Sequence, residues 1–236
     1  MVRKLLLILT FLLVQNSTYC QEENVVLFSE ALSAHFPKYE QKAAAAYRYR
    51  DFERAEMLFD SLVEYGLKGS SMDNFKFTRL NDKPVNLYDL KKPVYLITYA
   101  SWCITTKGEI PALNQLAEKY HDRIDFVVLF WDTKKITKQA AKAYSKHISV
   151  VYVDELYNKD AFVVSRLKHT LGLPTTFLLD TTKEILDVRR GVSHSYAIGL
   201  EESMDMNYNS IYDGIANHLL KDGNFDSGQD PIAVNN

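Results

Sequence analysis

The sequence predicts an α/β fold, in which a central mixed sheet is flanked by helices and follows an N-terminal helical extension. Two observations carry this prediction. From Asn74 onward, short apolar or alternating segments typical of strands take turns with amphipathic segments typical of helices. Before Asn74, residues 27–66 carry apolar side chains at helical spacing over much of their length.

We expect four regions along the chain: a signal peptide at 1–20, a helical extension at 21–70, the α/β domain at 71–223 and a flexible tail at 224–236. The composition, with 47% hydrophobic and 25% charged residues, is typical of a globular protein. The formal net charge of −2 gives no basic surface, so no nucleic-acid partner is expected.

The first twenty residues have the pattern of a signal peptide. Two cations precede the predominantly apolar run Leu5–Val14, and small residues precede the expected cleavage site before Gln21. The run is too short to cross a bilayer, which needs about 20 residues. The sequence therefore predicts a periplasmic or secreted protein. A short membrane anchor and a lipid attached to Cys20 remain as alternatives, although the bulky Tyr19 fits a lipoprotein signal poorly.

The extension is predicted to form a helical hairpin that packs on the following domain. Pro37 suggests that a short helix precedes a longer one. The second helix has one apolar face, made by Phe52, Ala55, Phe59, Leu62 and Val63. A tetratricopeptide-like unit that binds a partner is the alternative, but a single repeat cannot bury its own apolar face.

The elements of the α/β domain follow from the change in periodicity. Strands are expected at 74–80, 93–99, 124–130, 149–154, 175–180 and 184–191, and residues 85–90 are expected to form a short strand and a helical turn. Helices are expected at 104–120, 134–147, 159–170 and 207–221.

The segment Trp102–Pro111, "WCITTKGEIP", is the most informative part of the chain. It follows an apolar run and opens an amphipathic one, so Cys103 is expected at a strand-to-helix junction. Free N–H groups and the macrodipole at a helix N-terminus favour a thiolate, and we therefore expect the pKa of Cys103 to lie below the usual ~8.5. Cys103 is the predicted nucleophile, and an inert thiol is the alternative.

This segment resembles the pattern Trp-Cys-x-x-Cys-x-x-Glu-x-Pro of TlpA-type periplasmic proteins, which are redoxins of the thioredoxin-like superfamily. Trp102, Cys103, Glu109 and Pro111 are in register, whereas Thr106 stands where the second cysteine is expected. The resemblance implies a thioredoxin-like fold and thiol–disulfide oxidoreductase activity on protein thiols or disulfides, without a cofactor. Because no second cysteine can resolve a mixed disulfide, we expect a monothiol route that uses an external resolving thiol.

A second motif, "LGLPTTFLLD", supports the same resemblance. Pro174 matches the cis-proline that precedes the terminal hairpin in thioredoxin-like proteins, where it lies against the active-site cysteine. The resemblance implies that the backbone of Leu173 pairs with a client peptide.

A role is expected for each of three residues near Cys103. The Thr106 hydroxyl is expected to donate a hydrogen bond to the thiolate and so to lower its pKa. The resemblance places Glu109 beneath the active site, where it would tune the thiol; a surface carboxylate is the alternative. Trp102 is expected to form a wall beside the cysteine or, equally, to be an ordinary core aromatic.

The sequence gives less support to peroxidase or metal chemistry. Peroxiredoxins carry Pro and Thr seven and three residues before their cysteine, and Leu96 and Ala100 occupy those positions here. The six histidines lack metal-ligand spacing, so no metal is expected, and His194 is best explained as a solvated loop residue. Two functions therefore remain: a monothiol oxidoreductase, or a non-catalytic protein of the same fold that binds peptide or protein partners.

Overall fold

The computed structural model describes residues 25–154, 157, 167, 170–192 and 197–220. Four predicted features lie outside these residues: the signal peptide, the helix at 159–170, His194 and the C-terminal tail. Among the described residues, none of the helices is both long and apolar enough to cross a membrane.

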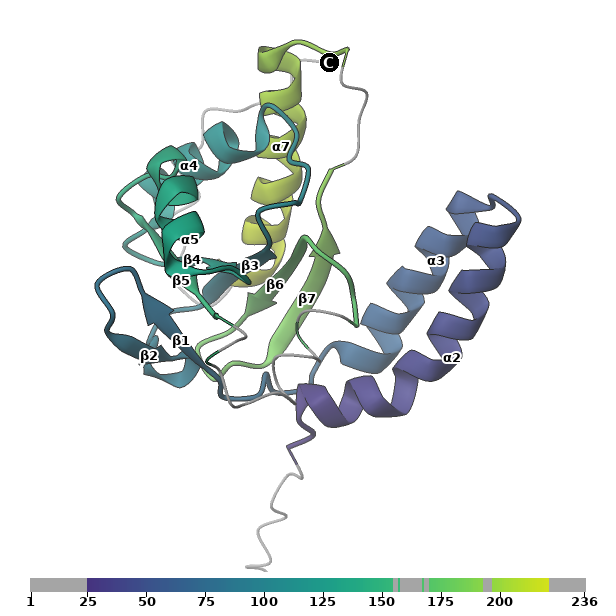
Figure 1. Cartoon of the computed structure of the whole chain (residues 1–236). Coiled ribbons are helices and arrows are strands. Elements are labelled where there is room, and N and C mark those ends of the chain that lie inside the picture. The colour runs from purple at the N-terminus through teal and green to yellow at the C-terminus, as the bar shows by residue number, and fades with distance from the viewer. Residues whose placement is uncertain (1–24, 155–156, 158–166, 168–169, 193–196, 221–236) are drawn as a thin grey trace, which may run out of the picture.

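A seven-stranded mixed sheet forms the centre of the molecule, with the strand order β2-β1-β5-β4-β3-β6-β7 (Figure 1). Strands β3, β4 and β5 are parallel to one another, and the other pairings are antiparallel. The strands are β1 (Lys76–Arg79), β2 (Pro84–Asn86), β3 (Val94–Tyr99), β4 (Asp125–Phe130), β5 (Ile148–Tyr152), β6 (Thr175–Leu179) and β7 (Ile185–Arg190). The predicted thioredoxin-like α/β fold is confirmed.

The two central strands determine where the site lies. All six residues of β3 are buried, and so are the apolar residues of β4, as expected of strands covered on both faces. Because β3 and β4 are parallel and in register from Val94 with Asp125 to Tyr99 with Phe130, their carboxyl ends meet at one edge of the sheet. The segments that leave these two strands are therefore neighbours.

Helices cover both faces of the sheet. On one face, α4 (Glu109–Tyr120), α5 (Lys134–Ala140) and α7 (Leu200–Gly214) enclose one apolar core. On the other face, the N-terminal hairpin of α2 (Phe28–Arg48) and α3 (Phe52–Leu62) contributes to a second core (Figure 1). The ring of Phe28 meets that of Phe177 edge to face at 5.5 Å, which confirms that the hairpin packs on the domain.

The predicted break at Pro37 is wrong, because α2 continues through it. Proline removes one helical hydrogen bond, but the carbonyl that loses its donor belongs to the exposed Ser33, where water can replace it. Burial of Leu32 and Tyr39 on either side stabilises the continuous helix. The chain turns instead at Arg50, whose φ is 56°, and Asp51 caps α3 by accepting a hydrogen bond from the Arg54 amide at 3.1 Å.

Most of the predicted apolar face of α3 is buried, as expected for Ala55, Phe59, Leu62 and Val63. Phe52 is the exception, with 63% of its surface exposed at the free end of the hairpin. After Leu62 the chain continues in a π-helical turn, Val63–Leu67.

Two other predicted boundaries are wrong. Helix α7 begins at Leu200 rather than at 207. The sequence did not show its first turns, because they lack apolar periodicity. Glu201 and Glu202 favour these turns, since they lie near the positive end of the helix dipole. The helix predicted at 134–147 ends at Ala140 and continues only as the 3-10 turn Ala141–Ala143.

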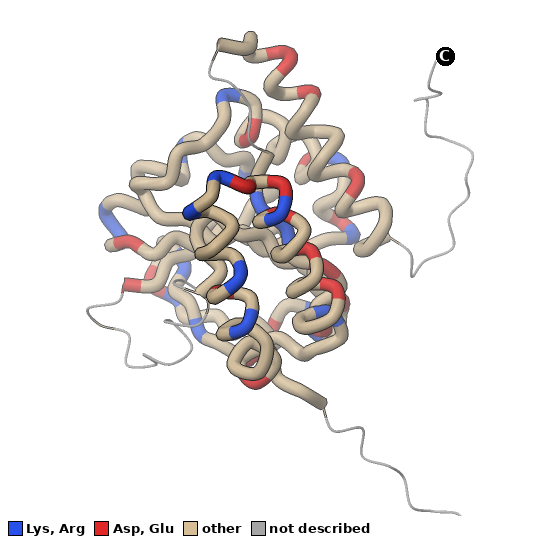
Figure 2. The backbone as a smooth tube through the Cα atoms, turned by 90° about the vertical axis from the view of Figure 1, so that its right-hand side faces the viewer, with Lys and Arg blue, Asp and Glu red and all other residues tan. Residues whose placement is uncertain are grey.

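Acidic and basic positions are interspersed along the chain (Figure 2).

Candidate active site

Cys103 lies in a tight turn that follows β3 directly. Its amide donates to the Ala100 carbonyl at 2.9 Å, and its Sγ accepts a hydrogen bond from the Ala100 amide at 3.3 Å. The thiol is half-buried, as is expected of a group between the end of a central strand and the loops around it.

The helix predicted from residue 104 is wrong in its first turn, because α4 begins at Glu109 with Gly108 as its N-cap. Helix α7 supplies the reason. Ser203 Oγ accepts a hydrogen bond from the Gly108 amide at 2.9 Å and so satisfies a helix-terminal N–H from outside the helix. The helix dipole acts within about one turn of its end, and Cys103 lies six residues before Glu109, so the dipole does not stabilise its thiolate.

The pKa of Cys103 is raised, not lowered as predicted. Burial has the largest effect, since it penalises the charged form, and the negative charge of Asp132 acts in the same direction. The hydrogen bond from the Ala100 amide opposes both effects without overcoming them. The thiol is therefore mainly protonated at neutral pH.

Asp132 also holds the turn in place. Its Oδ2 accepts from the Ser101 amide at 2.7 Å, and its Oδ1 accepts from the Ser101 hydroxyl at 2.8 Å. Sequence analysis missed this contact, although the signal was present: Asp132 follows β4 just as Ser101 follows β3, and the carboxyl ends of neighbouring parallel strands lie together.

Thr106 faces α7 rather than the thiol. Its Oγ1 accepts a hydrogen bond from Asn207 Nδ2 at 2.9 Å, and the same amide also donates to the Ser203 carbonyl at 2.6 Å. The hydrogen bond predicted from Thr106 to Cys103 is not found among the described residues, because residues 103–106 do not form a helical turn. The sequence gave no indication that Asn207 and Ser203 belong to this site.

Glu109 is half-buried, which rules out the fully solvated surface carboxylate. Burial raises its pKa from 4.5 to about 7, while a backbone hydrogen bond from Thr106 acts in the opposite direction. Burial is also the main reason why the pKa of Tyr144 is raised, and the charges of Glu109 and Cys103 add to that effect. Tyr144 therefore interacts electrostatically with both groups.

A hollow of about 500 Å³ brings the two sequence motifs together. Ile104, Thr106 and Glu109 line one part of it, and Leu173, Pro174 and Gly191 line another. The Leu173–Pro174 peptide bond is cis, as the resemblance predicted. A second hollow, of about 820 Å³, is lined by Cys103 itself together with apolar residues that include Tyr99, Phe130, Ile136 and Tyr144.

Trp102 and Ile104 flank the cysteine and are 68% and 74% exposed. Trp102 is therefore not a core aromatic; its predicted contact with a client remains a prediction. Among the described residues, no group of three or more His, Cys, Asp or Glu side chains could hold a metal ion.

The mixed sheet, the cysteine turn after its central strand and the cis-proline loop beside it define a thioredoxin-like protein. Residues 69–188, just over half of the chain, match the model of the AhpC/TSA family. The chain belongs to this family, and the predicted relationship to the redoxins is confirmed.

Curated relatives cover about half of the chain. Thioredoxin-like protein YneN of Bacillus subtilis is 27% identical over 133 residues, 56% of this chain and 76% of that protein. Thiol-disulfide oxidoreductase ResA of Bacillus cereus is 29% identical over 123 residues, 50% of this chain and 67% of that protein. Among solved structures, the thioredoxin domain of a Bacteroides vulgatus thiol-disulfide oxidoreductase is 21% identical, with a TM-score of 0.48 over 62% of this chain and 96% of that one.

Proposed function

We propose that this protein carries out thiol–disulfide exchange on polypeptide clients through Cys103 alone. The observation that carries the proposal is the position of Cys103: its half-buried thiol lines one hollow, and the adjacent Ile104 and Thr106 border a second hollow together with the Leu173–Pro174 loop. The relatives named as thiol-disulfide oxidoreductases support the same chemistry.

The proposed reaction has two exchanges. The Cys103 thiolate attacks one sulfur of a client disulfide, forms a mixed disulfide with it and releases the other client sulfur as a thiolate. An external thiolate then attacks the client sulfur of the mixed disulfide and restores the Cys103 thiolate. The client is then disulfide-bonded to the external thiol, and a second external thiolate can release it as a free thiol.

We propose that Glu109 acts as a proton donor in this site. Because burial raises its pKa to about 7, a substantial fraction of Glu109 is protonated at neutral pH. Since its side chain lines the hollow beside Pro174, it can protonate the client thiolate that leaves when the mixed disulfide forms. Leu173 and Trp102 are proposed to contact the client on either side.

The raised pKa of Cys103 also favours a second candidate function. A thiol that is mainly protonated at neutral pH attacks disulfides slowly, and Thr106 cannot resolve an adduct. A non-catalytic protein that binds peptides in the hollow beside Pro174 would have both properties. The two candidates differ in whether Cys103 reacts at all with a disulfide that is held in that hollow.

We propose a periplasmic or secreted location, based on the signal peptide predicted at 1–20. The compartment would supply the external resolving thiol, and contact with a membrane would require a lipid on Cys20. A fusion of residues 1–30 to a reporter enzyme that is active only after export would test the location. A reporter retained in the cytoplasm would contradict it.

The proposed exchange is tested by incubating the purified protein with two short peptides joined by one intermolecular disulfide, so that the released peptide thiol diffuses away, and measuring intact mass. We expect one covalent adduct on Cys103 that forms faster at pH 9 than at pH 7, because the pKa of the thiol is raised. The adduct should persist until an external thiol is added. A Cys103→Ser variant that forms the same adduct, or a native protein that forms none at either pH, would favour the binding protein.

A further inference from the structure

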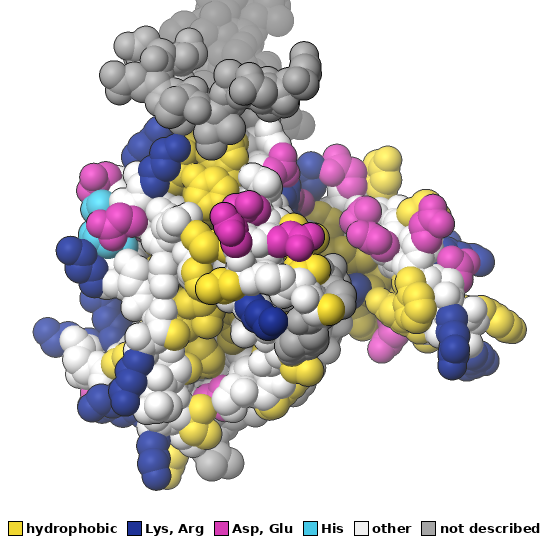
Figure 3. Space-filling model, turned by 90° about the horizontal axis from the view of Figure 1, so that it is seen from above, with side chains coloured by type: hydrophobic (Ala, Val, Ile, Leu, Met, Phe, Trp, Pro, Cys, Tyr) yellow, Lys and Arg dark blue, Asp and Glu magenta, His cyan; other side chains and the backbone are white. Residues whose placement is uncertain are grey.

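A groove separates the hairpin from the last strand of the sheet. It has a volume of about 990 Å³. One wall is α3 with the π-helical turn, and the other is Asp187–Arg190 of β7 with the following Gly191. Strand β7 ends the described strand order, so no further strand closes the groove along this edge. Figure 3 shows the hairpin standing out from the body, with a recess between them that is lined by hydrophobic side chains.

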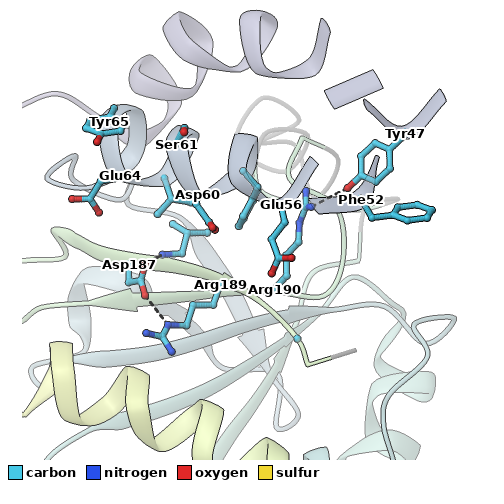
Figure 4. A pocket seen from close by; sticks show the side chains of 14 residues that line it. Tyr47, Phe52, Glu56, Asp60, Ser61, Glu64, Tyr65, Asp187, Arg189 and Arg190 are labelled. Carbon is cyan, nitrogen blue, oxygen red and sulfur yellow. Dashed lines mark hydrogen bonds and ion pairs between the residues drawn. The ribbon is translucent and has the colours of Figure 1, made fainter. Parts of the chain in front are cut away.

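The helical wall of the groove carries a row of carboxylates. Glu56, Asp60 and Glu64 are spaced four residues apart, so they lie on one face of the helix. Glu56 and Asp60 point from α3 toward β7 (Figure 4). Glu64 pairs with Lys68 at 2.6 Å, whereas neither Glu56 nor Asp60 has an ion-pair partner in the described part of the chain.

The cations of the groove are already engaged. Arg189 pairs with Asp187 at 2.6 Å and with Asp213 at 3.0 Å. Arg190 donates to the hydroxyls of Tyr39 and Tyr47 at 3.0 and 3.2 Å, and its guanidinium lies 4.0 Å from the centre of the Phe59 ring. The four carboxylates that line the groove outnumber its two guanidinium groups, and two of these carboxylates are exposed without an ion-pair partner among the described residues, which favours a cationic ligand.

The spacing of these carboxylates indicates the conformation of that ligand. Four residues of α-helix rise about 6 Å, which separates Glu56 from Asp60 along the groove. Alternate residues of an extended peptide are about 6.6 Å apart and point to the same side. An extended segment with Lys or Arg at every second position would therefore bring successive cations opposite successive carboxylates. Tyr47, Phe52 and Tyr65 line the same groove and are exposed, so they can pack against the alkyl stems of such side chains.

We propose that this groove binds an extended cationic segment, with Lys or Arg at alternate positions, of the client polypeptide. This inference rests on the proposed function, since it names the class of client. It also places the segment relative to Cys103: Arg190 and Gly191 line both this groove and the hollow beside Pro174. A client held between α3 and β7 would therefore extend directly into the site of exchange.

Fluorescence anisotropy with a labelled, cysteine-free peptide tests the inference. The probe has nine residues with Lys and Val alternating, and a second peptide of the same composition has its lysines in one block. We expect the alternating peptide to bind more tightly, and added salt to weaken binding. Two exposed ion pairs predict that Glu56→Gln with Asp60→Asn weakens binding by about tenfold.

The matched control is Glu40→Gln with Glu53→Gln, which removes the same charge from exposed residues of the hairpin outside the groove. The control should bind the alternating peptide as the native protein does. Equal losses in the two double variants, or equal affinity for the two peptides, would overturn the proposal. A variant with Glu56→Lys and Asp60→Lys should instead bind a peptide in which Glu alternates with Val. If this variant does not bind that peptide, the proposal is also contradicted.

The same binding measured on Cys103→Ser separates this inference from the proposed exchange. Since the probe lacks sulfur, its binding does not depend on the thiol. Peptide binding without adduct formation in the native protein would contradict only the exchange reaction, and adduct formation without selective peptide binding would contradict only the groove.

Discussion

Removal of the Ser203 hydroxyl tests how α7 positions the start of α4. In Ser203→Ala, the buried Gly108 amide loses the oxygen that accepts its hydrogen bond at 2.9 Å. The start of α4 cannot move closer to α7 to compensate, because their backbones are already in contact: a Cβ on Gly108 would lie 2.2 Å from the Met204 nitrogen. A buried N–H without a partner costs about 1–3 kcal/mol of unfolding free energy.

For a domain of this size, that cost lowers the midpoint of thermal unfolding by about 2–12 °C. Thermal unfolding followed by circular dichroism measures it. Ser210→Ala is the control, because Ser210 is on the same helix and its backbone carbonyl, not its hydroxyl, accepts the hydrogen bond from Arg189. If Ser203→Ala unfolds at the same temperature as the control, the external cap does not stabilise α4, and our explanation for its late start is wrong.

Three further predictions concern the neighbours of the thiol. In Asp132→Asn, the loss of a negative charge should move the pKa of Cys103 downward, as measured by alkylation rate against pH; an unchanged profile would contradict the assigned electrostatic effect. The Glu109 carboxyl has a higher pKa when folded, so the folded state binds its proton more tightly, and stability should fall by at most about 3 kcal/mol as pH rises from about 4.5 through 7. Glu109→Gln should remove that fall in chemical unfolding experiments, and a variant with the native slope would refute the assignment. In Thr106→Cys the new thiol would face α7 rather than Cys103, so we expect two free thiols under oxidising conditions and no gain of insulin reductase activity; an internal disulfide found by intact mass would contradict the geometry described for this turn.

The fold was largely predictable because its signals are local. Buried strands such as Val94–Tyr99 appear as uninterrupted apolar runs. The cis-proline at Pro174 was predicted by the resemblance of the LGLPTTFLLD motif to thioredoxin-like proteins, not by a local signal. The continuous helix through Pro37 was not predictable in the same way. It depends on burial of Leu32 and Tyr39 against other parts of the chain, which outweighs the preference of proline for a helix break.

The positions of the predicted site residues followed from the sequence more closely than the electrostatics did, and their roles remain predictions. Cys103 lines one hollow, and its neighbour Ile104 lines a second one together with Glu109 and the Leu173–Pro174 loop. The late start of α4 depends on Ser203, 95 residues further along the chain, and no periodicity near Cys103 reports such a contact. Because no helical turn starts at Cys103, burial and the charge of Asp132 determine its pKa. The pKa is therefore raised, whereas the sequence predicted that it would be lowered.

The most direct test of a reactive single cysteine is the rate at which the native protein forms a mixed disulfide, measured between pH 6 and 10 with two peptides joined by one intermolecular disulfide. The account predicts an adduct on Cys103 whose rate of formation rises with pH beyond the midpoint of an ordinary thiol, and that an external thiol releases. No adduct at any pH in this range, or the same adduct in Cys103→Ser, would contradict it.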